Sequence, residues 1–210
     1  MQKTNFLRAA SHELKTSVTA VSAMLENMIL GVGKYKDRDT YLAKCKVLTD
    51  RLAQMIKEIL DASRAEFAGE QEQTDFLIAD ALETVIEPYQ IIAKAKGIIF
   101  STVHLPRGMI EKVISNILEN AVSYTTSGSM INISCEEQRL VVENECALIP
   151  TEHLAHIFEP FYRPDYGRDS AVGGNGLGLY LVSTILKSLD ISYSFIPSEK
   201  INGMAFQISF

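Results

Sequence analysis

Two stretches of this chain repeat apolar residues at alternating spacings of four and three, and this repeat constrains the fold more than any other feature. Such spacing is typical of a helix that presents one apolar stripe to a neighbouring helix. The polar stretch between the two contains Gly31 and Gly33, so residues 1–66 are predicted to form a helical hairpin. The first stripe comprises Leu7, Ser11, Leu14, Val18, Val21, Leu25 and Met28, and the second comprises Tyr41, Cys45, Leu48, Leu52, Met55, Ile59 and Ala62.

A single hairpin covers two narrow apolar stripes poorly. A four-helix bundle assembled from two chains buries both stripes, so we expect a homodimer. The alternative is a hairpin that packs against the second domain of its own chain.

A second domain is predicted over residues 74–210. Residues 66–74 are polar, contain Gly69 and interrupt the heptad spacing, which indicates a short linker. Strands and helices then follow without a regular alternation, which favours an α+β sandwich with helices on one face of a mixed sheet. The expected helices span residues 78–96, 110–124 and 177–189, and the expected strands span 98–103, 130–135, 140–142, 191–197 and 204–210.

Charge and cysteine content exclude several classes of protein. The formal net charge is −6 and lysine and arginine residues form no cluster, which argues against a nucleic-acid partner. The three cysteines lack metal-ligand spacing, as expected for free thiols in a reducing cytoplasm. No apolar run is long enough to cross a bilayer, so we expect this chain to be soluble.

His12 is the first candidate for chemistry. It follows Ser11 of the apolar stripe, so it is expected beside the stripe and facing solvent. Glu13 can accept a hydrogen bond from one imidazole nitrogen and raise the basicity of the other, while Lys15 can attract a phosphate. These neighbours make His12 a candidate nucleophile for phosphorus. The alternative interpretation is a solvated helix face.

Residues on one predicted helix of the second domain are suited to bind a metal ion and the base of a nucleotide. Asn116 and Asn120 stand four residues apart, beside Glu119, and therefore project from one helix face. Oxygen ligands of this kind suit Mg²⁺ that is bound mainly through nucleotide phosphates. Tyr124, near the end of the same helix, can pack on an adenine ring, although core packing is its default role.

A glycine-rich segment precedes the last predicted helix. Gly174, Gly176 and Gly178 allow backbone N–H groups to approach phosphate oxygens at a helix start. Residues 164–172 are polar and irregular, which suits a mobile lid, and Arg163 at its edge can contact a phosphate. An ordinary surface loop is the alternative.

Taken in chain order, these motifs resemble the sequence boxes of the sensor histidine kinases of bacterial two-component systems. The similarity covers nearly the whole chain, and in detail it is greatest to the vancomycin-resistance sensor kinases. Residues 6–16 resemble the phosphoacceptor box, residues 113–125 the N box, residues 157–163 the F box and residues 173–179 the G2 box.

The resemblance implies a dimeric helical hairpin followed by an ATP-binding α/β sandwich of the Bergerat type. It implies that ATP phosphorylates His12 with Glu13 as base, and that the phosphoryl group passes to an aspartate of a response regulator. It also implies that Thr16 positions water in a phosphatase reaction. Such proteins usually carry an upstream membrane sensor, so this chain is expected to be the cytoplasmic part of a protein anchored in the inner or plasma membrane through a segment absent here.

The nucleotide site implied by the resemblance holds ATP and Mg²⁺. Asn120 is similar to the family's Mg²⁺ ligand, and Tyr124 to the residue that stacks on adenine. The full set of implied nucleotide-binding residues is Asn116, Asn120, Tyr124, Asn144, Arg163, Gly174, Gly176 and Gly178.

Four features depart from the family pattern. Ser17 stands where proline is usual, which predicts loss of a helix kink after His12. A short strand that the family has between Pro106 and Arg107 is missing, which predicts an abbreviated sheet, with the alternative that residues are omitted from the sequence at this point. Ser123 replaces a lysine that contacts phosphate.

The fourth departure lies in the G1 box. Asn144 replaces an aspartate, so an uncharged amide takes the place of the carboxylate that accepts a hydrogen bond from the adenine amino group. Cys146 and Leu148 replace two glycines that lie close to the base, which predicts weaker nucleotide binding.

The resulting hypothesis is an ATP-dependent protein histidine kinase. The first alternative is a degenerate kinase that acts mainly as a response-regulator phosphatase, which the altered G1 box and the retained Thr16 favour. The second is a nucleotide-gated dimeric interaction module without catalysis.

Overall fold

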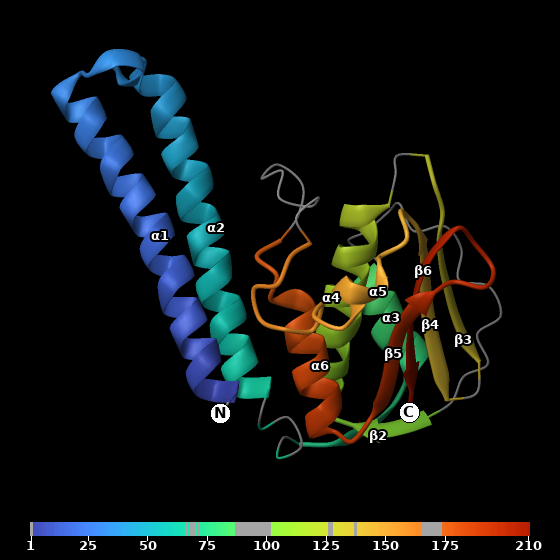
Figure 1. The fold of residues 1–210 in the computed structure, drawn as a ribbon. Helices are drawn as coiled ribbons and strands as arrows, with labels where there is room; N and C mark the ends of the chain where they lie inside the picture. Colours follow the sequence, from blue (N-terminus) through green and yellow to red (C-terminus); the bar gives the residue numbers. More distant parts are fainter. Residues whose placement is uncertain are drawn as a thin grey trace. The chain divides into compact units, whose positions relative to one another are not determined.

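The structure, a computed structural model, describes residues 2–65, 67, 70, 72–86, 102–125, 128–136, 138–164 and 174–210. The chain divides into two compact units, Met1–Asp61 and Ala62–Phe210. Two long helices, α1 (Gln2–Leu30) and α2 (Arg38–Ala65), run antiparallel and are joined through the short 3-10 helix η1 (Gly33–Lys36) (Figure 1). The predicted helical hairpin is therefore confirmed.

Local sequence explains where α1 ends. Gly31 adopts φ +63°, which a residue with a side chain rarely does. This conformation lets the Gly31 N–H donate to the Met28 carbonyl and the Val32 N–H donate to the Asn27 carbonyl, so that two terminal carbonyls of the helix are satisfied. α1 continues without interruption through Ser17, where the family pattern would place a kink-forming proline.

An aspartate begins α2. The Asp37 carboxylate accepts a hydrogen bond from the Thr40 backbone N–H at 3.3 Å, the geometry of a helix N-cap. Hydrogen bonds from the Thr40 side chain and backbone hold the pKa of Asp37 below its ordinary value.

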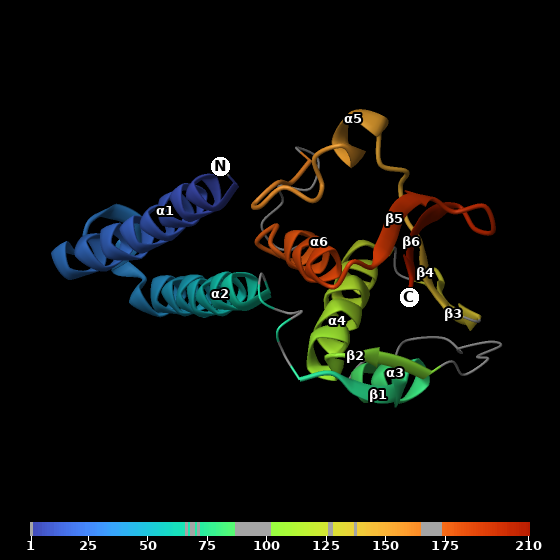
Figure 2. The same ribbon diagram turned by 90° about the horizontal axis from the view of Figure 1, so that it is seen from below.

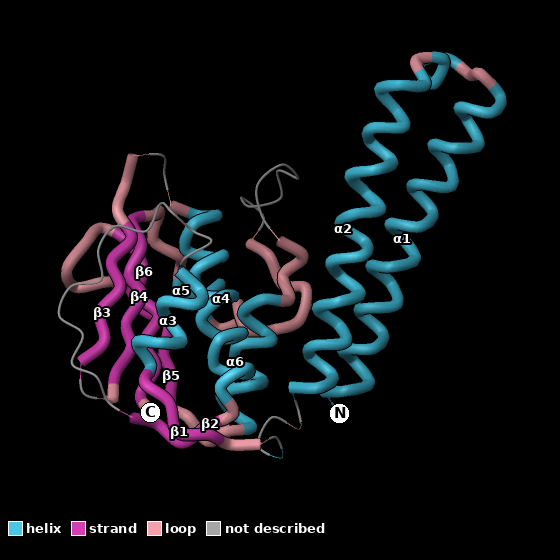
Figure 3. The backbone as a smooth tube through the Cα atoms, turned by 180° about the vertical axis from the view of Figure 1, so that it is seen from behind, coloured by secondary structure: helices cyan, strands magenta, loops and turns pink. Residues whose placement is uncertain are grey.

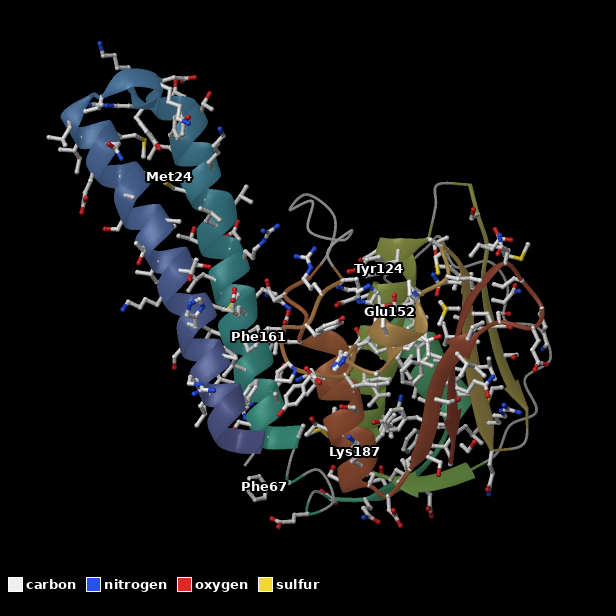
Figure 4. All side chains as sticks on the ribbon, in the orientation of Figure 1. Met24, Phe67, Tyr124, Glu152, Phe161 and Lys187 are labelled. Atoms are coloured by element: carbon white, nitrogen blue, oxygen red, sulfur yellow. The ribbon has the colours of Figure 1, made fainter. Side chains whose placement is uncertain are left out.

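The hairpin buries its two predicted stripes unevenly. Near the connecting loop, Met28, Tyr41 and Cys45 form a buried cluster, against which the partly buried Met24 packs (Figure 4). Three large apolar members of the first stripe remain exposed in the single chain, as expected for a stripe that one partner helix covers poorly: Leu7, Val18 and Leu25. Members of the second stripe are buried or half-buried along the length of α2.

The second unit contains two antiparallel sheets. The larger has the strand order β3-β4-β6-β5 and is formed by β3 (Ile131–Glu136), β4 (Arg139–Glu145), β5 (Ser192–Pro197) and β6 (Gly203–Ser209). In the smaller, β1 (Thr74–Leu77) pairs with β2 (Thr102–Leu105). All strand pairs among the described residues are antiparallel, so these residues do not form the mixed sheet that was predicted. Short connections join β3 to β4 and β5 to β6, and such hairpins can only pair antiparallel.

Two helices, α4 (Arg107–Tyr124) and α6 (Gly178–Ser188), lie on one face of the larger sheet (Figures 2 and 3). Both present an apolar face at helical spacing, and the inward residues of the strands alternate with outward ones, so the core lies between these two layers. The sheet contributes Ile131, Ile133, Cys135, Leu140, Val142, Met204, Phe206 and Ile208, and α4 contributes Ile110, Val113, Ile114, Ile117, Leu118 and Ala121. Of the helices that the structure describes, none combines the length and apolar character that a bilayer crossing requires.

Several element bounds differ from the prediction. α3 (Ile78–Ile86) accounts for the start of the helix predicted over 78–96, and residues 87–101, which include most of the next predicted strand, lie outside the described residues. β2 is followed directly by Pro106 and α4, so no strand lies between Pro106 and Arg107, as the sequence predicted. β1 and the helix α5 (Thr151–Leu154) were not predicted, because four residues are too few to show a period.

Candidate functional site

The candidate nucleophile lies on the solvent-facing side of α1. The His12 side chain is 79% exposed, which confirms its predicted placement. Its Nδ1 atom lies 3.8 Å from Oε1 of Glu13, which is longer than a hydrogen bond. Thr16, one turn further along, is also exposed and donates its hydroxyl proton to the His12 carbonyl at 3.0 Å. The helix therefore presents imidazole, carboxylate and hydroxyl groups together.

In the second unit, Asn116, Asn120 and Tyr124 form one row along α4. The Asn116 Nδ2 atom donates to the Lys112 carbonyl at 2.8 Å. Its Oδ1 atom faces the start of α6, because a Cβ atom added to Gly178 would lie 3.1 Å from it. Asn120 is half-buried, and Tyr124 is exposed at the end of the helix (Figure 4). The row thus runs from the glycine-rich segment to the end of α4.

The glycine-rich segment is held against a turn that belongs to the F-box motif. Gly176 has φ +74° and its carbonyl accepts a hydrogen bond from the Phe161 N–H at 3.0 Å. A Cβ atom at Gly176 would lie 2.9 Å from backbone atoms of Phe161 and Tyr162, so both conformation and space require glycine. Gly174 differs, because a Cβ atom there would meet nothing within 4 Å.

Aromatic contacts anchor this turn to the sheet. The Phe158 ring packs edge-on against Tyr193 of β5 at a centroid distance of 5.3 Å. Tyr162 Oη is hydrogen-bonded to His153 Nδ1 at 2.6 Å. Arg163 follows directly and is half-buried, whereas residues 165–173, with most of the predicted lid and Gly173, lie outside the described residues.

Asn144 is a buried polar residue on the helix-facing side of β4. It is 5% exposed, and its Nδ2 atom donates to Thr125 Oγ1 at 3.2 Å. Burial raises the pKa of the Cys146 thiol, and hydrogen bonds from the Met204 backbone and the Asn144 side chain partly offset that rise. Leu148 is exposed.

Two residues that the sequence analysis did not single out support Asn144. Thr125, at the end of α4, connects the helix to β4 through the bond just described. Gly203 opens β6 against the Asn144 carbonyl, and a Cβ atom there would clash with that oxygen and lie 2.8 Å from the Asn144 carbonyl carbon. The pair Asn202-Gly203 before a closing strand is a turn signal, but its close contact depends on a strand pairing that spans 59 positions.

The second-unit residues suit a purine nucleotide. A buried amide that is hydrogen-bonded to the residue after an exposed tyrosine matches a flat, polar-edged base, and the glycines before α6 leave backbone free of side chains. In the described part of the chain, His, Cys, Asp and Glu form no group of three that could hold a metal. The Asn120 amide oxygen fits Mg²⁺ because this ion is commonly held by few protein oxygens and completed by substrate phosphates.

Comparison with known protein families gives two matches along the chain. Residues 2–68 match the His Kinase A (phospho-acceptor) domain. Residues 107–210 match the histidine kinase-, DNA gyrase B- and HSP90-like ATPase family.

The curated proteins with similar sequences include sensor kinases and sensor proteins. The chain is 33% identical over 215 residues to sensor histidine protein kinase HK06 of Streptococcus pneumoniae, covering 99% of this chain and 48% of that protein. It is 34% identical over 204 residues to sensor protein VanSB of Enterococcus faecalis, covering 90% and 45%. The chain thus spans about half the length of the curated relatives it matches.

Among solved structures, the fold resembles Acinetobacter baumannii histidine kinase AdeS with a TM-score of 0.70 and 22% identity, covering 95% of this chain and 96% of that one. It also resembles histidine kinase ThkA in a complex with response regulator protein TrrA, with a TM-score of 0.70 and 20% identity, covering 97% and 60%.

Proposed function

The chain belongs to the sensor histidine kinases, and we propose that it transfers the γ-phosphoryl group of ATP to His12 and then to an aspartate of a response regulator. The observation that carries this proposal is the exposed His12 imidazole beside Glu13, in a chain whose second unit has an ATPase-family fold. A histidine in that position has no packing role, since its side chain touches mostly solvent.

The acceptor chemistry follows from the two side chains. A neutral imidazole that keeps its proton on Nδ1, toward Glu13, leaves the Nε2 lone pair free to attack phosphorus. The new N–P bond forms as the bond from phosphorus to the ADP oxygen breaks, and the Glu13 carboxylate takes the Nδ1 proton. Because Nδ1 and Oε1 are 3.8 Å apart before reaction, a side-chain rotation brings Glu13 into hydrogen-bond range first.

The second unit binds the nucleotide in this proposal. Asn144 accepts a hydrogen bond from the adenine amino group, Tyr124 stacks on the ring, and Arg163 contacts a phosphate. Gly174, Gly176 and Gly178 offer backbone N–H groups to the phosphates at the start of α6. Gly174 has open space around it, and Asn116 lies beside Gly178. Asn120 holds Mg²⁺, which when bound stabilises negative charge on the phosphate oxygens.

Incubation of the chain with Mg²⁺ and γ-labelled ATP tests the proposal. We expect label on the protein that is lost in acid and retained in base, because a phosphoramidate N–P bond has that stability whereas a phosphoserine ester has the opposite. Nucleotide binding without any protein-bound label would overturn the kinase assignment and favour a response-regulator phosphatase or a non-catalytic interaction module.

A homodimer is part of the proposal. Exposed apolar side chains lie on both hairpin helices, and burying one leucine against a second copy contributes about 1.5–3 kcal/mol. They include Leu7, Val18 and Leu25 on α1 and Leu42, Ile56 and Leu60 on α2. A four-helix bundle of two hairpins covers such surfaces.

We also propose that this chain is part of a longer protein. Because the curated relatives are about twice as long as this chain, we infer that it is the catalytic part of a membrane-anchored sensor. The solved complex of ThkA with a response regulator supports a response regulator as partner.

Thr16 supports a second activity, dephosphorylation of that partner. Its hydroxyl proton is donated to the His12 carbonyl, so its oxygen lone pairs can accept a hydrogen bond from a water molecule. A water held in this way keeps its own lone pair directed outward for attack on a phospho-aspartate.

Replacing Thr16 by alanine is expected to slow that dephosphorylation about tenfold or more, the factor that loss of one positioning hydrogen bond of about 1.4 kcal/mol produces. The measurement is the decay of labelled regulator phosphate in the presence of the chain. Thr16→Ser keeps the hydroxyl and is expected to keep the rate. An equal rate in Thr16→Ala would rule out this role for the hydroxyl.

A further inference from the structure

Asn144 has a side chain whose function depends on its orientation. An aspartate offers two equivalent oxygens, whereas an asparagine offers an acceptor at Oδ1 and a donor at Nδ2. The two atoms are nearly alike in size, so the hydrogen-bond network around them decides which atom faces which partner. For a buried amide that contacts a base, this orientation decides which base it accepts.

Thr125 determines the orientation through the position of its own proton. Its hydroxyl donates to the Ala121 carbonyl at 2.6 Å, within the last turn of α4. A hydroxyl has a single proton, so Thr125 Oγ1 can only accept a hydrogen bond from Asn144 at 3.2 Å. The Asn144 atom that faces it must therefore be the donor, Nδ2. With this contact made through an N–H group, Oδ1 is the Asn144 atom left to accept a hydrogen bond from a ligand.

We propose that Thr125 is a positioning residue that makes the nucleotide site selective for adenine over guanine. This inference rests on the proposed function, in which Asn144 contacts the base. Adenine carries a donor amino group at C6, and guanine carries an acceptor oxygen there. Oδ1 matches adenine, and only the reversed amide would match guanine.

The test compares ATP and GTP binding to the full chain in the presence of Mg²⁺, by titration calorimetry. Thr125→Val keeps the shape but removes the acceptor, so the amide can reverse. We expect the ratio of GTP to ATP dissociation constants to fall about tenfold, as loss of one hydrogen-bond preference predicts. Thr125→Ser retains the hydroxyl and is expected to retain the ratio.

Testing Thr125→Val in a chain that also carries Asn144→Asp distinguishes an effect on the amide orientation from a general loss of structure at the site. In Asn144→Asp the acceptor has no orientation to lose, so adding Thr125→Val is expected to change the ATP to GTP ratio less than about twofold. A Thr125→Val ratio within about twofold of the unmodified chain, or an equal tenfold change in both backgrounds, would overturn the inference. Absence of ATP binding by the unmodified chain would instead overturn the proposed function, and this inference with it.

Discussion

Replacing His12 by glutamine is expected to abolish the transfer of labelled phosphate from ATP to the chain while leaving ATP binding unchanged. The amide nitrogen of glutamine has no available lone pair, so it cannot form the N–P bond that imidazole forms. Because His12 is 79% exposed and its side chain packs against little, the substitution should not alter folding. The measurement is acid-labile, base-stable label per chain, with ATP affinity determined on the same preparation.

His156 provides a matched control for this experiment. It is an exposed histidine in the second unit whose Nδ1 is hydrogen-bonded to Glu159 at 2.7 Å. His156→Gln removes another exposed histidine, one outside α1, and this variant should still be labelled. Label that persists in His12→Gln would show that another residue accepts the phosphoryl group.

Replacing Gly203 by alanine is expected to destabilise the second unit by about 3 kcal/mol, the upper part of the range for forcing atoms into a well-packed site. A Cβ atom at this position would clash with the Asn144 carbonyl oxygen across the β4 and β6 pair. These are the two inner strands of the larger sheet, so neither can move aside without disturbing a further strand. Urea unfolding followed by circular dichroism measures the change.

Gly108 offers the control for that substitution. It lies in the first turn of α4, with nothing within 4 Å of an added Cβ atom. Gly108→Ala is expected to stabilise the same unit by about 0.4–1 kcal/mol, because it restricts the unfolded chain. If Gly203→Ala unfolded at the same urea concentration as the unmodified chain, the β4 and β6 pair would have to tolerate displacement. In that case ATP affinity would report whether Asn144 moved.

The regular parts of the fold could be predicted because their signals are local. The heptad spacing marks both hairpin helices, and the apolar period marks α4 and α6. The period does not say which residues of a wide apolar face meet the partner helix. On α1 that face extends to Phe6 and Ala10, which are buried while their neighbour Leu7 is exposed.

The missed features depend on contacts between distant segments. The bond between Thr125 and Asn144 joins a helix end to a strand 19 positions later, and no spacing in the sequence indicates it. Position 203 must be glycine because a side chain there would clash with the backbone of Asn144, and the two residues become neighbours only when β4 and β6 pair. The glycine-rich segment could be identified from its composition, but its attachment to Phe161 required the structure.

That attachment has a consequence for changes in chain length. The bond from the Phe161 N–H to the Gly176 carbonyl joins two positions fifteen residues apart, and the F-box turn and the start of α6 hold its two ends in place. The entropic cost of closing a loop grows only with the logarithm of its length, by about 0.6 kcal/mol for each doubling. An insertion that doubles the chain length between these two anchors is therefore expected to cost about 0.6 kcal/mol of the free energy of unfolding.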